Sequence, residues 1–580
     1  MPLAVNPFDS RRLIGTLTEV TPTSAKLNLP NAAQAEGQWL HGRRLGGGEV
    51  GEFVLIENGD YAILGRIVSV KLPEKERLSV EEDLGAKRES HPLGTIQLLV
   101  TIIVSQGKVI GGITQYPRLG SRVFSAHPEL IKWVSEASQR TPTNADPIAI
   151  EFASIPLASD TVVSLTPERL FGRHCAVLGA TGGGKSWTLA RLIEQCANHN
   201  AKLLLIDASG EFHTLDQHVL HYQIGEGTPE PAATKEATLP YRELKEVDLF
   251  AIFRPSGGIQ HPKLRAAIKS LKLAAVLGAA SPLVKNGMIA KANQPKAPIE
   301  AAQITHAVAI QSATVELDID KLVGQIQNEC TYPAADFGKD QTKYGDTTPN
   351  DVSNCVGLLA RIEGAISSTE LKCIFKPDKK PSITKVISDF LADDKYRVLR
   401  ISLRYLPSSL NAPELVANAI GRYLLGTAKT GKFLKQPVVL FVDEAHQFLN
   451  KVLGDENQPY PLDSFELIAK EGRKHSLNLC LATQRPRDIP EGILSQMGTL
   501  IVHRLINDRD REVVERASGD IDRSAAAFLP TLVPGEAVVI GSDFAIPLVI
   551  SVSEPLAKPV SMGPDYQTSW RLKPKGKISK

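Results

Sequence analysis

The sequence has no long apolar run. Its most apolar stretch is residues 98–104 (LLVTIIV), seven residues interrupted by Thr101, whereas a membrane-spanning helix needs about 20 apolar residues. The amino-terminal MPLAVNPFDSRR reaches proline and charge before the apolar core of a secretory signal can form. We therefore expect a cytoplasmic protein that neither crosses a membrane nor is secreted.

The chain also has few cysteines and no charge excess. Its six cysteines form no CxxC pair and have no histidines at zinc-ligand spacing, which favours reduced thiols packed in the interior. With 66 basic and 64 acidic residues the formal charge is +2, which neither supports nor excludes nucleic-acid binding. One local excess is the carboxyl-terminal RLKPKGKISK, interpreted as a solvated tail or, alternatively, as an arm that binds nucleic acid or a partner.

The length of 580 residues predicts roughly three to five domains. The amino-terminal region shows short strands with the hairpin signal Asn58-Gly59-Asp60, which favours a small closed β-barrel. From Arg173 the pattern becomes strand, glycine-rich loop, helix and strand, a βαβ unit that predicts a parallel sheet covered by helices. Strand signals return at 398–403, 438–442, 477–483, 499–504 and 536–540.

These patterns divide the chain into five expected parts. Residues 257–394, between the βαβ unit and the strand signal at 398–403, have apolar residues at helical spacing and are interpreted as a helical insertion. The expected parts are a barrel at 1–125, the first part of an α/β core at 126–256, the insertion at 257–394, the second part of the core at 395–552, and a basic arm at 553–580.

Residues 179–186 (GATGGGKS) match the phosphate-binding pattern GxxxxGK[ST], after an apolar strand and before a helix. Glycines let backbone amides turn toward phosphate, and the helix amino terminus adds positive potential. Lys185 would neutralise the β and γ phosphates, and the Ser186 hydroxyl would hold Mg²⁺; the alternative is a turn that only joins strand to helix. The expected nucleotide-binding residues are Gly179, Ala180, Thr181, Gly182, Gly183, Gly184, Lys185, Ser186 and Trp187.

Two acids, Asp443 and Glu444, follow the apolar segment 438–442. Asp443 would bind Mg²⁺ through water and Glu444 would polarise the attacking water, which predicts an NTP hydrolase instead of a kinase. Acids after a strand can also cap a helix. The run Asp443-Glu444-Ala445-His446 spells the motif of a helicase superfamily with two tandem RecA-like lobes; only one ATPase core is visible, so we interpret the spelling as coincidence.

Polar residues after neighbouring strands are further candidates. Gln484 would sense the γ phosphate or orient water, or else is a surface amide. Asp207 and Glu211 would join the shell of the metal or of the water, or else cap a helix or form an ion pair.

With one core per chain, a charge-stabilising arginine must come from the same chain or from a neighbour in a ring. Arg473, after an expected helix, is the preferred candidate, and Arg485 and Arg504 are weaker ones. The alternative for Arg473 is a basic residue that interacts with the helix dipole.

Together these residues resemble the HerA family, in the FtsK/HerA branch of RecA-like motor ATPases. The segments that carry the resemblance are LGATGGGKSWT, IDASGEF, VVLFVDEAHQFL, EGRKHSLNLCLATQRP and LVPGEAVVIG, with GRIVSV and QYPRLGSRVF in the barrel. The fold class implied is α/β, a RecA-like P-loop ATPase core with an N-terminal small β-barrel and a helical insertion.

The resemblance also implies a function. Such proteins form homohexameric rings that hydrolyse ATP with Mg²⁺ and move double-stranded DNA through a central channel. Many act with an effector on the barrel face, a nuclease or a sirtuin-like NAD-consuming enzyme, in antiphage defence or DNA end processing. By position, Lys185, Ser186, Asp443, Glu444, Gln484 and Arg473 match the family's phosphate, metal, water, sensor and finger roles.

A second function from a different class stays open. An ATP-regulated oligomeric scaffold could assemble and activate an effector without moving DNA. A small-molecule kinase is a third possibility, but it leaves the barrel and the segment around Gln484 unexplained.

Overall fold

The computed structural model describes the chain in two compact units. The described residues are 3, 5–30, 39–40, 43–44, 47–72, 92–136, 147–156, 158–311, 317–408, 411–449, 452–455, 458–518, 523–541, 544, 546–560, 566 and 570–571. Unit 1 holds those of 1–203, 424–450 and 463–555, and unit 2 holds those of 204–423, 451–462 and 556–580. Lys573, Lys575, Lys577 and Lys580 of the expected basic arm lie outside the described residues. Among the helices described, none is both long enough and apolar enough to span a bilayer.

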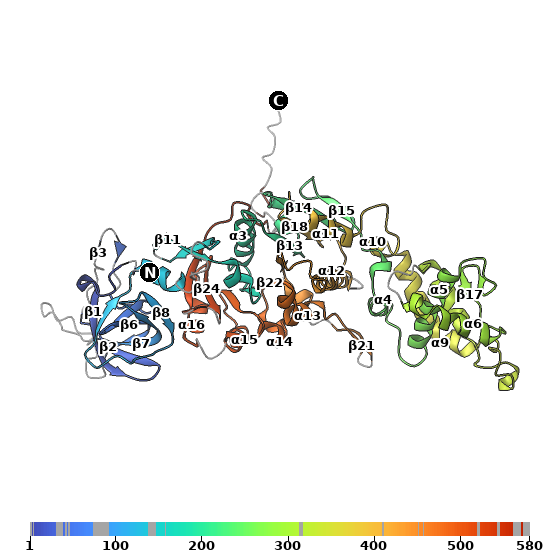
Figure 1. Ribbon diagram of the computed structural model, residues 1–580, viewed down its shortest axis with the longest axis horizontal. Coiled ribbons are helices and arrows are strands. Elements are labelled where there is room, and N and C mark those ends of the chain that lie inside the picture. Colours follow the sequence, from blue (N-terminus) through green and yellow to red (C-terminus); the bar gives the residue numbers. More distant parts are fainter. Residues whose placement is uncertain are drawn as a thin grey trace, which may run out of the picture. The chain divides into compact units, whose positions relative to one another are not determined.

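Unit 1 begins with a closed β-barrel (Figure 1, blue). Its strands follow the order β2-β1-β9-β5-β6-β7-β8, and β2 also pairs with β7, so that six strands close into a ring. Closure leaves no unpaired edge in that ring. The strands are β1 (Leu13–Val20), β2 (Ser24–Asn28), β5 (Phe53–Asn58), β6 (Tyr61–Lys71), β7 (Leu93–Ile103), β8 (Lys108–Gly111) and β9 (Arg122–Ser125).

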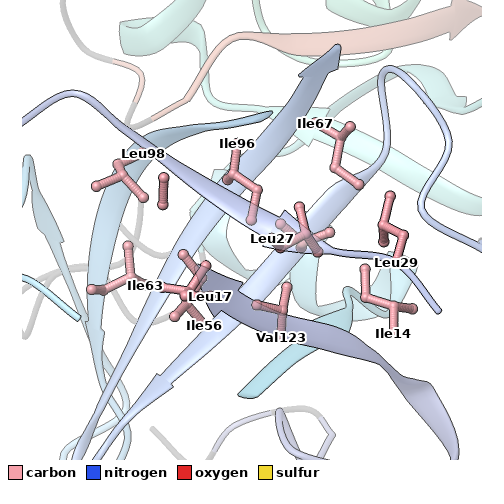
Figure 2. Close-up of a cluster of buried hydrophobic side chains, with 12 residues drawn as sticks. Ile14, Leu17, Leu27, Leu29, Ile56, Ile63, Ile67, Ile96, Leu98 and Val123 are labelled. Atoms are coloured by element: carbon pink, nitrogen blue, oxygen red, sulfur yellow. The ribbon is translucent and has the colours of Figure 1, made fainter. Parts of the chain in front are cut away.

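Alternating side chains fill the barrel. In β7 buried residues alternate with half-buried ones over most of the strand, because successive side chains of a strand point to opposite faces. Figure 2 shows the resulting apolar cluster, in which Leu27, Ile63 and Ile96 are fully buried. The β5–β6 hairpin turns at Gly59-Asp60 between the paired residues Asn58 and Tyr61, and Gly59 adopts a φ of +65°, which suits the Asn-Gly signal.

The second part of unit 1 is an α/β sheet. Its strand order is β11-β10-β25-β24-β23-β12-β22-β19, and β23, β12, β22 and β19 are parallel neighbours. The strands are β10 (Ile150–Ile155), β11 (Ala158–Leu165), β12 (Cys175–Leu178), β19 (Val438–Val442), β22 (Leu477–Thr483), β23 (Thr499–His503), β24 (Glu536–Gly541) and β25 (Leu548–Val552).

One expectation for this sheet is wrong. Residues 536–540 were expected to extend a parallel sheet, but β24 runs antiparallel to β23, and β25, β10 and β11 continue antiparallel. The short link between β24 and β25 accounts for the antiparallel pairing of these two strands, since a parallel pair needs a crossover of a dozen or more residues. The helices of unit 1 are α1 (Pro128–Glu136), α2 (Pro167–Phe171), α3 (Lys185–Ala197), α13 (Ser464–Glu471), α14 (Glu491–Leu494), α15 (Asp508–Ser518) and α16 (Arg523–Phe528).

Unit 2 combines strands with a helical region. The strands follow the order β13-β18-β14-β15, and β14 is parallel to both β18 and β15. They are β13 (Lys202–Asp207), β14 (Val219–Ile224), β15 (Lys235–Ala237) and β18 (Val398–Ser402). The helices that lie wholly or mostly in this unit are α4 (Glu246–Phe253), α5 (Gln260–Leu277), α6 (Lys296–Thr305), α7 (Ala307–Gln311), α8 (Leu322–Glu329), α9 (Pro349–Ser367), α10 (Lys372–Phe375), α11 (Ile383–Ala392) and α12 (Ala412–Lys429).

The helical region packs around α8, which contacts both α5 and α9 (Figure 1, green to yellow). A buried polar network lies within it. Glu329 accepts from Lys291 at 2.5 Å, from Ser270 at 2.6 Å and from Gln325 at 3.0 Å. These partners satisfy a carboxylate that would otherwise be costly to bury.

Candidate active site

The phosphate-binding segment lies between β12 and α3, as its sequence pattern requires. Gly182 and Gly184 adopt φ values of +76° and +110°, a region that residues with a Cβ rarely enter. Gly184 directly precedes α3, which begins at Lys185. The loop therefore places backbone amides and a helix amino terminus where a phosphate would bind.

The loop is fixed from several sides by backbone hydrogen bonds. Gly179 N–H donates to Thr483 O at 3.3 Å, and Ala180 N–H donates to Arg504 O at 3.1 Å. Gly535 N–H donates to Gly183 O at 3.2 Å. The carboxyl ends of β22 and β23 thus hold the loop in place, which preorganises it for a ligand.

His503, which sequence analysis did not select, lies against this loop. The imidazole is fully buried, with Nδ1 2.8 Å from Glu536 O and Nε2 2.7 Å from Thr188 Oγ1 of α3. Burial lowers the pKa of His503 to about 4, so the ring is neutral at pH 7. A Cβ on Gly179 would lie only 2.6 Å from the His503 Cβ, so glycine is the residue that fits there.

Lys185 meets both predicted acids. Its Nζ lies 3.1 Å from Asp443 Oδ1 and 2.8 Å from Glu444 Oε1, and all three side chains are buried. Burial alone would lower the pKa of Lys185, but the attraction of the two carboxylates outweighs it and the pKa is raised. The ammonium group is therefore charged where it would meet a triphosphate.

Glu444 has an unusual backbone and a free acceptor. Its φ is +47° and its ψ +45°, a left-handed conformation that is strained for a residue of this kind. Its buried Oε2 atom has no hydrogen-bond partner among the described residues. Strain and an unsatisfied buried oxygen in the same residue are features that cluster at active sites.

Gln484 bridges the loop and Glu444. Its Nε2 donates to Glu444 Oε1 at 2.5 Å, and its Oε1 accepts a hydrogen bond from the Thr181 hydroxyl of the phosphate-binding loop. The structure thus joins Thr181, Lys185, Asp443, Glu444 and Gln484 in one hydrogen-bonded group. Two other residues of the expected set lie at the start of α3, where Ser186 is half-buried and Trp187 is 40% exposed.

Arg473 lies at the opposite edge of the sheet from this group. Arg473 precedes β22, whereas Gln484 follows β22. The strands β12 and β19 run parallel to β22 and bring Lys185 and Glu444 to the carboxyl edge, where Gln484 lies. The seven residues of β22 separate the two edges by about 20 Å at about 3.3 Å per residue. Arg473 therefore does not reach the Lys185 site of its own chain.

Arg473 shares its edge with other cations. A cavity of about 660 Å³ is lined by Arg173, Lys470, Arg473 and Lys474. Sequence analysis did not select Arg173. Arg173 directly precedes His174 and β12, so it comes to this edge because β12 and β22 run parallel and in register.

The two weaker arginine candidates lie at the carboxyl edge instead. Arg485 is exposed, with its guanidinium 3.7 Å from Asp488. Arg504 is also exposed, and its carbonyl holds the loop at Ala180. Arg485 and Arg504 each follow a strand at the carboxyl edge, where Lys185 lies, whereas Arg473 lies at the opposite edge.

Asp207 and Glu211 belong to unit 2. Asp207 is fully buried, and its Oδ2 lies 2.7 Å from Arg400 Nε while its carboxylate also accepts the N–H groups of Gly210 and Phe212. The carbonyl of Glu211 accepts from the Val560 N–H at 3.0 Å. These contacts correspond to the ion-pair alternative for Asp207, and a role of either acid in the shell of a metal stays a prediction.

The donor atoms fit Mg²⁺. This ion prefers hard oxygen ligands and keeps several waters, and Asp443 and Ser186 place a carboxylate and a hydroxyl next to the loop. The unpartnered Oε2 of Glu444 offers a further acceptor for a water. When bound, Mg²⁺ would neutralise charge on the phosphates.

Fold and site together define the class of this protein as an α/β P-loop ATPase with a RecA-like core and an N-terminal β-barrel. The family model "Helicase HerA, central domain" matches residues 150–344, and "Helicase HerA-like C-terminal" matches residues 427–539. The chain belongs to the HerA family, as the motifs predicted. It is therefore an ATPase of the translocase and helicase type.

Relatives and solved structures are similar to it over most of its length. The DNA double-strand break repair helicase HerA of Saccharolobus solfataricus is 26% identical over 409 residues, which cover 69% of this chain and 68% of that protein. The protein of the same name from Sulfolobus acidocaldarius is 23% identical over 404 residues, 69% of this chain and 68% of that one. The plasmid coupling protein TrwB in complex with ADP and Mg²⁺ aligns with a TM-score of 0.42 and 16% identity, covering 74% of this chain and 92% of that one.

His503 and Arg173 are the functional candidates that sequence reasoning missed. The available signal for His503 was a polar residue at the end of an apolar strand, and for Arg173 a cation just before β12. Neither signal shows which other residues lie near His503 or Arg173 in the folded chain. Only the pairing of β12 with both β23 and β22 shows which residues lie beside them.

Proposed function

We propose that this chain is an ATP-hydrolysing translocase that acts on double-stranded DNA in the cytoplasm as a homohexameric ring. The observation that carries the proposal is the buried Lys185 between Asp443 and Glu444. A cation in a phosphate-binding loop that faces two carboxylates is the arrangement expected for Mg²⁺-dependent hydrolysis of a triphosphate. Relatives described as DNA repair helicases support DNA as the substrate.

Each residue of the group has a proposed role. The loop amides and Lys185 bind the β and γ phosphates, while Ser186 and Asp443 hold the Mg²⁺ ion. Glu444 accepts a proton from the attacking water. Gln484, which bonds both Thr181 and Glu444, detects whether the γ phosphate is present.

A ring supplies the remaining charge. Because Arg473 lies at the edge opposite Lys185, we propose that it stabilises the transition state at the site of a neighbouring subunit. The cations that line the same cavity make this edge attractive to a phosphate. A head-to-tail interface of this kind closes into a ring when the rotation allows it.

We also propose that the ring works with an effector protein on its barrel face, a nuclease or a sirtuin-like NAD-consuming enzyme, in antiphage defence or DNA end processing. The support for this proposal is the resemblance to the family. The loops after Phe212 and around Lys451 are the places to search for pore contacts, and the second includes residues outside the described part of the chain.

The central test is ATP hydrolysis by the full-length protein with and without duplex DNA. Duplex DNA should stimulate hydrolysis, and the stimulation should weaken as salt rises, because contacts to phosphates release counterions. Lys185→Ala should abolish hydrolysis and ATP binding. The exposed Lys432 provides a control, and Lys432→Ala should behave as the unaltered protein does. A pure hexamer whose ATP hydrolysis is not stimulated by duplex DNA would contradict the proposal.

A second measurement distinguishes a motor from a scaffold. Glu444→Gln should bind ATP without hydrolysing it. If this variant still assembles with the effector and activates it fully, DNA movement is unnecessary and the scaffold function replaces the translocase. If effector activity on DNA is lost while assembly persists, hydrolysis is required.

A further inference from the structure

The two oxygens of the Glu444 carboxylate have different surroundings. Oε1 accepts from Gln484 Nε2 at 2.5 Å and from Lys185 Nζ at 2.8 Å. Oε2 lies 3.3 Å from His446 Nδ1, but within the described residues no donor has hydrogen-bond geometry toward it. One oxygen is therefore saturated, and the other keeps its capacity to accept a proton.

The imidazole of His446 is held by Thr483, the last residue of β22. Thr483 is fully buried, and its hydroxyl oxygen accepts the Arg485 N–H at 3.0 Å. The same hydroxyl lies 3.2 Å from His446 Nδ1. Nδ1 of His446 therefore lies between two oxygens, Thr483 Oγ1 and Glu444 Oε2.

Burial determines the charge of the ring. Burial lowers the pKa of His446, against the attraction of Glu444, so the imidazole is neutral at pH 7. Nδ1 lies 3.3 Å from Glu444 Oε2 without hydrogen-bond geometry, so the lone pairs of that oxygen stay available.

We propose that His446 is a positioning residue for Glu444: fixed by Thr483, the ring supports the Oε2 side of the carboxylate and leaves this oxygen open for the proton of the attacking water. The inference rests on the proposed hydrolysis of ATP at this site. Residues at the end of β22 then position both oxygens of the Glu444 carboxylate. Gln484 bonds Oε1, and Thr483 holds His446 beside Oε2. His446, the fourth residue of the run that spells a helicase motif, thus has a local role beside Glu444.

The test separates binding from turnover in the full-length protein with duplex DNA. His446→Ala and Thr483→Val should lower kcat about 10- to 100-fold, the size expected when a reacting group is misplaced by about an ångström. The dissociation constant for ATP, from calorimetry, should stay within about twofold of the original, since Thr483 bonds the phosphate-binding loop through its backbone carbonyl, which Thr483→Val keeps. His306→Ala, in the helical region, is the matched histidine control and should leave kcat unchanged.

Conservative variants and a double variant distinguish positioning from a general packing role. Thr483→Ser keeps the hydroxyl and His446→Asn keeps a polar atom near Nδ1, so both should recover most of kcat. In the His446→Ala background, Thr483→Val should cause little further loss, because both substitutions break the same link. Additive losses, a kcat of His446→Ala equal to the original, or a parallel loss of ATP binding would each overturn the inference.

The outcome also remains separate from that of the proposed function. If the unaltered protein does not hydrolyse ATP at all, the proposed function fails. If it hydrolyses ATP and His446→Ala does so equally well, only the role of His446 fails.

Discussion

Lys185 and Glu444, which are 259 positions apart in the chain, form a buried ion pair of 2.8 Å at the carboxyl edge of the sheet. The same ammonium group is the proposed ligand of the β and γ phosphates. A bound triphosphate therefore competes with Glu444 for Lys185, and its arrival would free Glu444 Oε1 from one of its two donors. Binding of nucleotide and preparation of the catalytic carboxylate are coupled through this pair.

The left-handed backbone of Glu444 predicts a difference between two variants that both remove its charge. Glu444→Gln and Glu444→Asn should each abolish hydrolysis while retaining ATP binding. Asparagine tolerates this backbone region better than glutamine does, so Glu444→Asn should be the more stable variant by about 1 kcal/mol. Chemical denaturation of both variants measures the difference, and equal stability would show that the strain is absent.

The position of Arg473 predicts activity in mixed rings. Lys185→Ala subunits cannot bind ATP but keep Arg473, while Arg473→Ala subunits keep an intact phosphate-binding loop. Each variant alone should be inactive. Mixing and reassembling the two should restore part of the DNA-stimulated ATPase, because some interfaces join a good loop to a good arginine. An Arg473→Ala protein with normal activity on its own would rule out this role.

The close approach of Gly179 to His503 predicts a steric cost. Gly179→Ala places a Cβ 2.6 Å from the His503 Cβ and should destabilise the protein by about 1 to 3 kcal/mol, as overpacking in a well-packed site does. ATP affinity should fall with it, since the loop must shift. Gly492, which lies in α14 of the same unit, has no atom within 4 Å of the added Cβ, so Gly492→Ala should not destabilise the protein and should leave ATP affinity unchanged. Thermal unfolding and calorimetry provide the comparison.

Buried neutral histidines predict loss of stability in acid. Burial lowers the pKa values of His174, His221 and His503 to about 4 each, from 6.5. Between pH 6.5 and pH 4 the unfolded chain binds more protons than the folded one, so the free energy of unfolding decreases as pH falls. At pH 4 the loss amounts to about 3 kcal/mol per histidine.

A variant isolates the contribution of one ring. In His503→Gln the slope of the free energy of unfolding against pH, measured by urea denaturation from pH 7 to pH 5, should be smaller than in the unaltered protein. His306→Gln serves as the control and should keep the original slope. An unchanged slope in His503→Gln would mean that His503 binds protons equally in the folded and the unfolded chain, which contradicts the lowered pKa.

Local patterns predicted much of this protein. The glycine signal at Gly59 marks the β5–β6 hairpin, and the segments 438–442 and 477–483 coincide with β19 and β22. The family follows from the phosphate-binding loop and the segments that resemble HerA. Such a loop can be recognised in a sequence because its phosphate-binding groups come from a short run of residues between a strand and a helix. The barrel was expected from the short strands and the hairpin signal of the amino-terminal region.

The sequence by itself determined which groups carry the chemistry, since glycine, lysine and carboxylate have fixed properties wherever they lie. Only the tertiary structure decided which of them meet. Parallel pairing of β12 with β22 and β23 places Lys185, Gln484 and His503 together and sends Arg473 to the far edge. Strand order depends on the packing of the whole sheet, and no stretch of neighbouring residues encodes it.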